Sequence, residues 1–209
     1  MKILYEDKYL VVAEKPAGTP SQPDPSGRED MTALLKKECS SDIFCVHRLD
    51  TATSGVMVYA KNSKIAGQLT ASLSAPDAVK QYICIVHGEC SGQGEMKDLL
   101  FHDKRKNKAY VVDRARAGVK EALLDYEALG SKDGFSLVKV TLHTGRTHQI
   151  RVQFASRKLP LMGDGKYGAK DNLPLALHCF HLSFSHPVTK KVIDTVSYPD
   201  SPWHSFDLI

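Results

Sequence analysis

Residues 47–55 are HRLDTATSG and lead directly into the apolar run GVMVYA at residues 55–60. The run has the length and composition of a buried β-strand, so Asp50 is expected in a polar loop at the rim of a hydrophobic core. Hydrogen bonds and an arginine partner at such a position favour the ionised carboxylate. Asp50 is therefore a candidate nucleophile or general base, although an aspartate in a turn or a helix cap explains the same pattern.

Outward from this segment, short apolar runs alternate with loops rich in Gly and Pro, at 16–30 and 158–174. Strands outnumber helices and many sequential neighbours suit antiparallel pairing, which favours the α+β class. The expected strands are 9–13, 55–60, 79–87, 110–112, 123–129, 135–142, 175–184 and 191–196. The expected helices are 31–38 with Asp30 as N-cap, a helix capped by Asn62 or Ser63 that carries Ile65, Leu69 and Leu73, and 147–157.

Two further segments carry chemical groups. In GRTHQIR at 145–151, a helix would place Thr147 and His148 on the same face as Arg151, where they could hold phosphate or a carboxylate; a solvated helix face is the alternative. In KQYICIVHG at 80–88, Tyr82 lies on an expected strand and could stack on a nucleobase; a half-buried core tyrosine is the alternative.

Composition narrows the class of protein. The chain has 209 residues, of which 42% are hydrophobic and 25% charged, with a net charge of +4, as expected for a single soluble globular domain spanning 1–209. It has no long apolar run and no signal peptide, so a cytoplasmic protein is expected. Five cysteines without a C-x-x-C pair argue against disulfides and zinc, and the motifs of metalloproteases, nucleotide-cofactor enzymes and serine hydrolases are missing. No cofactor and no metal are therefore expected.

Positive charge gathers between residues 97 and 120. Eight basic residues stand there against three acidic ones, so the local surplus exceeds that of the whole chain. Such a segment favours binding to a nucleic-acid backbone, with a solvated basic hairpin as the alternative. The candidate RNA-binding loop consists of Lys104, Arg105, Lys106 and Lys108.

Taken in order, the motifs resemble those of the RluA-type pseudouridine synthase family. The resemblance runs from about Tyr9 to Pro187 and rests on YLVVAEKPAG, HRLDTATSG, KQYICIVHG, GRTHQIR, GDGKYG at 163–168 and ALHCFHLSFSHP. It implies a mixed, mostly antiparallel sheet with flanking helices and a central cleft. It also implies isomerisation of uridine to pseudouridine in rRNA or tRNA, without a cofactor. Because the signature begins near residue 9, we expect no RNA-binding module before it, and a monomer is the default.

The resemblance also implies residue roles. Asp50 matches the essential catalytic aspartate, Tyr82 the tyrosine that stacks on the target uracil, and Arg151 the basic residue that pairs with the catalytic carboxylate. Further substrate-binding residues are expected at Arg48, which matches an arginine thought to enter the RNA, and at Thr53, Arg146 and His148. Two departures from the family pattern are Cys84, often Ala, and Gln153, often His.

Two other classes of function stay open. An RNA-binding or RNA-folding factor could share the fold without isomerising anything, although it would not need to keep all three catalytic residues. A nucleoside or glycoside hydrolase also cleaves a glycosidic bond, but it typically uses a second acidic catalyst, and the 47–55 segment offers only Asp50.

Overall fold

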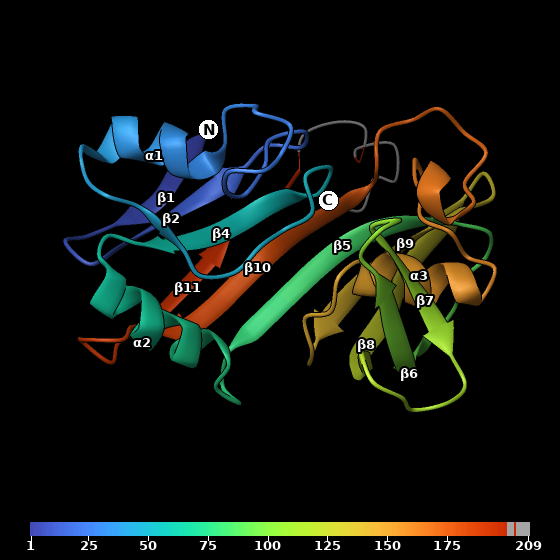
Figure 1. Ribbon diagram of the computed structural model, residues 1–209. Coiled ribbons are helices and arrows are strands. Elements are labelled where there is room, and N and C mark those ends of the chain that lie inside the picture. Colours follow the sequence, from blue (N-terminus) through green and yellow to red (C-terminus); the bar gives the residue numbers. More distant parts are fainter. Residues whose placement is uncertain (200–202, 204–209) are drawn as a thin grey trace. The chain divides into compact units, whose positions relative to one another are not determined.

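A computed structural model describes residues 1–199 and 203 (Figure 1). The described chain forms two compact units. The N-terminal unit contains Met1–Lys80 and Cys179–Pro199, and the central unit contains Gln81–His178 together with Trp203. The expected assignment of residues 1–209 to one catalytic domain stays a prediction.

The N-terminal unit is built on a sheet with two helices. Its strand order is β1 (Lys2–Glu6), β2 (Leu10–Lys15), β4 (Ser54–Ala60) and β10 (Leu177–Ser185). Two more strands join this sheet: β11 (Val192–Val196) pairs with β10, and the short β3 (Phe44–Cys45) pairs with β4. The helices are α1 (Met31–Cys39) and α2 (Ser63–Leu73).

Both faces of this sheet are covered. Ile65, Leu69 and Leu73 of α2 pack against alternate residues of β2 and β4 in one apolar cluster, which also contains side chains of β10 and β11. The loop between β2 and α1 covers the opposite face, where Ser21 contacts the side chains of Met57 and Tyr59. Strand β4 is thus packed on both faces, and the segment that carries Asp50 leads directly into its first residue, Ser54.

The expected helix caps are confirmed. The Asp30 carboxylate accepts a hydrogen bond of 2.8 Å from the Thr32 N–H at the start of α1. The Asn62 side chain accepts a hydrogen bond of 2.9 Å from the Ile65 N–H at the start of α2. Each cap satisfies a backbone donor that has no partner within the first helical turn.

The central unit is an antiparallel sheet with one α-helix on it. Its strand order is β5 (Val79–His87), β9 (Phe135–Leu142), β8 (Val119–Lys132), β6 (Gln93–Asp103) and β7 (Lys108–Val112). Helix α3 (Gln149–Ser156) packs Val152 against Leu100, Ala109 and Ala122 of β6, β7 and β8. A 3-10 turn, η1 (Gly165–Tyr167), lies in the Gly-rich loop after α3.

The α+β class and the mostly antiparallel pairing are confirmed, and β5 and β9 have the predicted bounds. The helix expected over 147–157 begins only at Gln149. His148 has a left-handed φ of 55°, so Thr147 and His148 precede the helix and their predicted helical face shared with Arg151 is wrong. Strands β1, β3 and β6 were not predicted. None of the helices in the described part of the chain is long and apolar enough to cross a membrane.

Candidate active site

Asp50 opens a tight turn immediately before β4. The Thr53 N–H donates to the Asp50 carbonyl at 2.9 Å, and β4 begins at the next residue, Ser54. Asp50 itself is partly buried. The turn thus places a carboxylate at the end of a fully packed strand, as the sequence predicts.

Lys15, at the end of β2, ties this turn to the preceding loop. Its buried ammonium group donates to the carbonyls of Pro16 at 3.0 Å, Thr19 at 2.7 Å and Thr51 at 3.1 Å. Burial lowers the pKa of Lys15 to about 8, and the negative charge of Asp50 opposes part of this lowering. One cation therefore holds two loops together beside the candidate catalytic carboxylate.

The residues before Asp50 are fixed by two further contacts. The Ser21 hydroxyl donates to the Leu49 carbonyl at 2.8 Å. The same hydroxyl oxygen accepts a hydrogen bond of 3.2 Å from the Leu49 N–H. His47 accepts a hydrogen bond of 3.1 Å from the Val58 N–H through Nε2. Removal from water, helped by the positive charge of Lys80, lowers the pKa of His47 to about 4, so it is neutral near pH 7 and can act as that acceptor.

Gly55 lets β4 approach β10 closely. Its φ is +121°, and a Cβ added there would lie 2.2 Å from the carbonyl oxygen of Cys179. Only glycine combines that conformation with that distance. The glycine of the HRLDTATSG segment is therefore a packing requirement at the point where the strand leaves the Asp50 turn.

The other predicted residues of this segment differ in exposure. Arg48 is exposed, and Thr53 is 2% exposed. Among the described residues, the buried Thr53 hydroxyl has no hydrogen-bond partner. Since buried hydroxyls are normally hydrogen-bonded, this oxygen has unused capacity for a ligand.

In the central unit, Tyr82 lies on β5 opposite Val140 of β9. The residue is 8% exposed, and Ile83, Cys84 and Ile85 continue the buried part of the strand. Its position on a packed strand gives the ring a fixed orientation.

Arg151 of α3 forms a buried, two-pronged ion pair with Asp164. Its Nε donates to Asp164 Oδ2 at 2.7 Å and its Nη2 donates to Oδ1 at 2.8 Å. The two side chains are 10% and 0% exposed. The guanidinium also lies 5.2 Å from the ring centre of Tyr167. Asp164 therefore fixes the plane of the Arg151 guanidinium.

Residues 144–149 form an anchored turn before α3. The Gln149 side chain accepts from the Thr144 hydroxyl at 2.8 Å and from the Arg146 N–H at 3.0 Å. Arg146 Nε donates to the Glu121 carbonyl of β8 at 2.8 Å. His148 Nδ1 lies 2.9 Å from the Tyr167 hydroxyl. These contacts replace the regular helix that the sequence predicts for Thr147 and His148.

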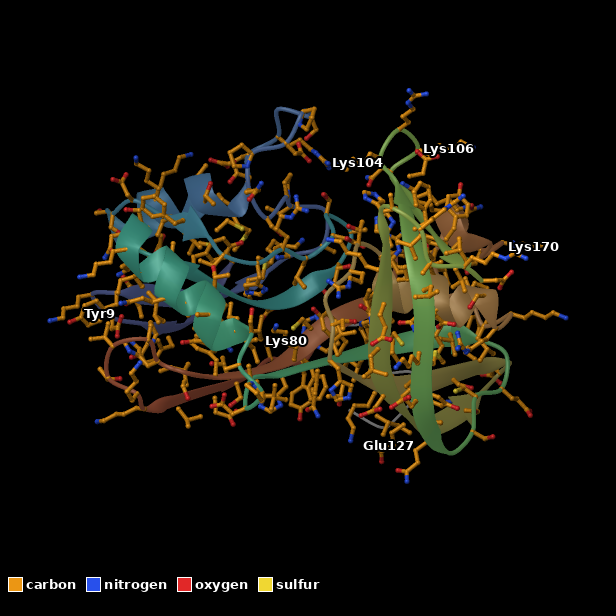
Figure 2. All side chains as sticks on the ribbon, turned by 60° about the horizontal axis from the view of Figure 1, so that its bottom comes forward. Tyr9, Lys80, Lys104, Lys106, Glu127 and Lys170 are labelled. Atoms are coloured by element: carbon orange, nitrogen blue, oxygen red, sulfur yellow. The ribbon has the colours of Figure 1, made fainter. Side chains whose placement is uncertain are left out.

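The candidate RNA-binding residues lie in the turn between β6 and β7. Lys104, Arg105 and Lys106 are exposed there, and Figure 2 shows Lys104 and Lys106 near the tip of this hairpin. Lys108 begins β7 and lies 5.2 Å from the ring centre of Tyr167. The Tyr167 hydroxyl accepts from the Ala109 N–H at 2.8 Å, which fastens the hairpin to the loop after α3.

The predicted residues are divided between the units. Asp50, Arg48 and Thr53 belong to the N-terminal unit, and the others belong to the central unit. The structure adds three residues to which the sequence analysis assigned no role: Lys15, Asp164 and Tyr167. Lys15 lies in the motif YLVVAEKPAG, and Asp164 and Tyr167 lie in GDGKYG. The sequence signal that could have identified them is a charged or aromatic side chain inside one of these motifs.

Comparison with known proteins decides the family. The family model described as RNA pseudouridylate synthase matches residues 9–156, which include Asp50, Tyr82 and Arg151. The chain belongs to the RNA pseudouridylate synthase family. Enzymes of this family are isomerases that convert uridine in RNA to pseudouridine, and this chain is an isomerase of that class.

Individual relatives of this synthase agree with that assignment and with the RluA-type resemblance. The chain is 31% identical to tRNA pseudouridine synthase C of Pasteurella multocida, over 100% of this chain and 95% of the relative. It is also 31% identical to ribosomal large subunit pseudouridine synthase D of Zymomonas mobilis, over 93% of this chain and 68% of the relative. The solved structure of human RNA pseudouridylate synthase domain containing 4 matches with a TM-score of 0.77 at 25% identity, covering 99% of this chain and 92% of that one.

Proposed function

We propose that this synthase isomerises specific uridines of tRNA or rRNA, with Asp50 as its catalytic carboxylate. The observation that carries the proposal is the family match over 9–156, a segment that contains Asp50, Tyr82 and Arg151, to which the motif resemblance assigns the catalytic roles. The relatives named above act on tRNA and on the large ribosomal subunit, so both RNA classes are candidate substrates. We further propose that the protein is a cytoplasmic monomer and that it needs no cofactor.

The reaction breaks the N-glycosidic bond of uridine, turns the uracil and rejoins it to the ribose through carbon 5. A carboxylate near the sugar attacks it or takes a proton, and Asp50 is proposed for this step in either role. The contacts of Lys15 and Ser21 with the residues around Asp50 support the assignment, because a reacting group must be held in place before the substrate arrives.

Tyr82 and Arg151 are proposed to serve the same reaction. A tyrosine ring fixed on a strand suits a platform on which the detached uracil stays until it is reattached. A guanidinium suits a partner for the catalytic carboxylate, and the pairing with Asp164 supports this role because it fixes the orientation of the group.

The remaining predicted residues are proposed to bind RNA. The Thr53 hydroxyl, which is buried and unpartnered among the described residues, is proposed to hydrogen-bond the bound nucleotide. Arg48 is proposed to occupy the place of the flipped base, whose removal from the stack costs a few kcal/mol. Arg146, His148 and the basic turn at 104–106 with Lys108 are proposed to contact the RNA strand and offset that cost.

Release of tritium from RNA labelled at carbon 5 of uridine tests the proposal. Wild-type protein is expected to release tritium from tRNA or rRNA and to leave pseudouridine in the digested product. Tyr82→Ala should lose most of this activity and Asp50→Asn all of it, with RNA binding retained. Lys64→Gln, an exposed change on α2, is the matched control and should behave as wild type.

Other products would identify the alternatives. Free uracil would show hydrolysis of the glycosidic bond. RNA binding without tritium release from any RNA class would show a binding or folding factor. Either result would contradict the proposed isomerisation.

A further inference from the structure

Tyr167 contacts two sets of residues that have different proposed roles. It ends the 3-10 turn η1, which directly follows Asp164, the ion-pair partner of Arg151. The Asp164 carbonyl accepts a hydrogen bond of 3.0 Å from the Tyr167 N–H. Tyr167 therefore has a fixed position relative to the carboxylate that holds Arg151.

The hydroxyl group of Tyr167 fastens the open edge of the β6–β7 hairpin. Strand β7 is the last strand of the described sheet, where it pairs with β6. The Ala109 N–H of β7 donates to the Tyr167 hydroxyl oxygen at 2.8 Å. The neighbouring Lys166 ammonium donates to the Asn107 carbonyl of the same hairpin at 3.0 Å. The η1 turn thus holds the hairpin that carries the basic turn at 104–106.

The ring of Tyr167 contacts three side chains with proposed roles. The Arg151 guanidinium and the Lys108 ammonium each lie over the ring, 5.2 Å from its centre. The His148 ring meets it edge-on, with 5.6 Å between the ring centres and an interplanar angle of 82°. Because aromatic faces attract cations, the Tyr167 ring restrains the Arg151 guanidinium in addition to the Asp164 carboxylate.

Packing explains the ring of Tyr167 but not its hydroxyl group. The side chain is partly buried and lies against the apolar cluster formed by Leu100, Ala109, Ala122 and Val152. A phenylalanine would fill the same space. It could not accept from the Ala109 N–H, and it could not bond His148 Nδ1, which lies 2.9 Å from the hydroxyl oxygen.

We propose that Tyr167 is a positioning residue that couples RNA binding at the β6–β7 hairpin to the orientation of Arg151. Its hydroxyl group sets the hairpin and His148 for RNA, whereas its ring holds the Arg151 guanidinium for the reaction. This coupling rests on the proposed function, in which the hairpin and His148 bind RNA and Arg151 serves the catalytic carboxylate. The two parts of one side chain therefore have separable effects on binding and on turnover.

Steady-state tritium release from total tRNA and rRNA labelled at carbon 5 of uridine separates these effects. Tyr167→Phe removes the hydroxyl and keeps the ring. It should raise the half-saturating RNA concentration about three- to ten-fold, as expected for one lost hydrogen bond, and leave the rate at saturation within about two-fold. Tyr167→Met removes both groups and keeps an unbranched apolar side chain. It should show at least that rise and also lower the rate at saturation by about ten-fold or more.

Tyr110→Phe is the matched control, because it makes the same chemical change on β7 of the same hairpin. The Tyr110 hydroxyl forms no hydrogen bond within the described part of the chain, so this variant should behave as wild type. A purely structural role of Tyr167 would lower the fraction of folded enzyme. That reduces the rate at saturation and leaves the half-saturating RNA concentration unchanged. Far-UV circular dichroism of each variant measures the folded fraction.

Two results would overturn the proposed coupling. One is a half-saturating RNA concentration of Tyr167→Phe within about two-fold of wild type. The other is a rate at saturation of folded Tyr167→Met within about two-fold of wild type. If Tyr167→Met unfolds, Tyr167→Phe still decides, because the conservative change must alter binding without altering turnover.

RNA binding in the Asp50→Asn background separates the coupling from the proposed isomerisation. Filter retention of the same labelled RNA measures affinity without turnover, and Tyr167→Phe should weaken it about three- to ten-fold there as well. Absence of tritium release by wild type, with this loss of affinity present, would reject the isomerisation and keep the hydroxyl contact. Tritium release that no Tyr167 variant changes would reject the coupling alone.

Discussion

Replacing Asp164 by Asn should destabilise the protein strongly. The change is nearly isosteric, but it removes the negative charge that Arg151 contacts through two hydrogen bonds of 2.7 and 2.8 Å. The two side chains are only 10% and 0% exposed, so water compensates poorly for the charge that the substitution removes. Breaking a buried ion pair from one side typically costs about 3–5 kcal/mol, so we expect a loss of this size in the free energy of unfolding.

Urea unfolding followed by far-UV circular dichroism at pH 7 measures that loss. For a chain of this length, each kcal/mol corresponds to about 2–4 °C, so the thermal midpoint should fall by roughly 6–20 °C. Asp42→Asn is the control, because Asp42 and Lys36 form a pair on the surface with side chains 70% and 65% exposed. That variant should be indistinguishable from wild type.

Removing both partners completes the test. Arg151→Gln combined with Asp164→Asn should cost less than the two single changes added together, because both changes remove the same ion pair and residues in direct contact are not additive. The reasoning is refuted if Asp164→Asn loses less than about 1 kcal/mol, or if the effects of the two changes are additive.

Three more changes test the N-terminal unit. Gly55→Ala should cost about 3 kcal/mol or more in urea unfolding, because its Cβ would overlap the backbone of Cys179, and a cost near zero would refute this close approach. The pKa of His47 is about 4 in the folded protein, below its ordinary 6.5, so His47 should lower wild-type stability by about 2–3 kcal/mol as the pH drops from 6.5 to 4. His47→Gln should flatten this pH dependence, and parallel stability curves for wild type and variant would contradict the assignment. The folded pKa of Lys15, about 8, lies below its ordinary 10.5, so wild-type stability should rise between pH 8 and 10.5, where the unfolded chain still binds the proton; Lys15→Met should lose this rise and lower the rate of tritium release.

Elements governed by local rules were predictable from the sequence. Strand β5 has the predicted bounds because its loosely alternating pattern over 79–87 is followed directly by Gly88. Asp30 and Asn62 cap their helices as expected because capping depends on a few neighbouring residues. Strand β6 was missed because charged residues break the apolar pattern of QGEMKDLLFHD, and it is paired on both sides by β7 and β8.

Features that depend on distant contacts were not predictable. Helix α3 starts at Gln149 because the side chain of that residue bonds Thr144 and the carbonyl of Leu123 on β8, and no local signal reveals this contact. The same holds for Lys15, whose partner Thr51 is 36 residues away, and for Asp164, which lies 13 residues beyond Arg151. Motif order thus named the candidate functional residues, while the contacts that hold their segments in place required the folded chain.

The proposed role of Asp50 is tested most directly by the rate of tritium release from carbon-5-labelled RNA by Asp50→Asn, with RNA binding measured on the same preparation. The substitution keeps the shape of the side chain and the backbone turn to Thr53, and it removes the carboxylate. We predict no tritium release above the protein-free control and RNA affinity close to that of wild type. Release at the wild-type rate would contradict the assignment of Asp50 as the catalytic group.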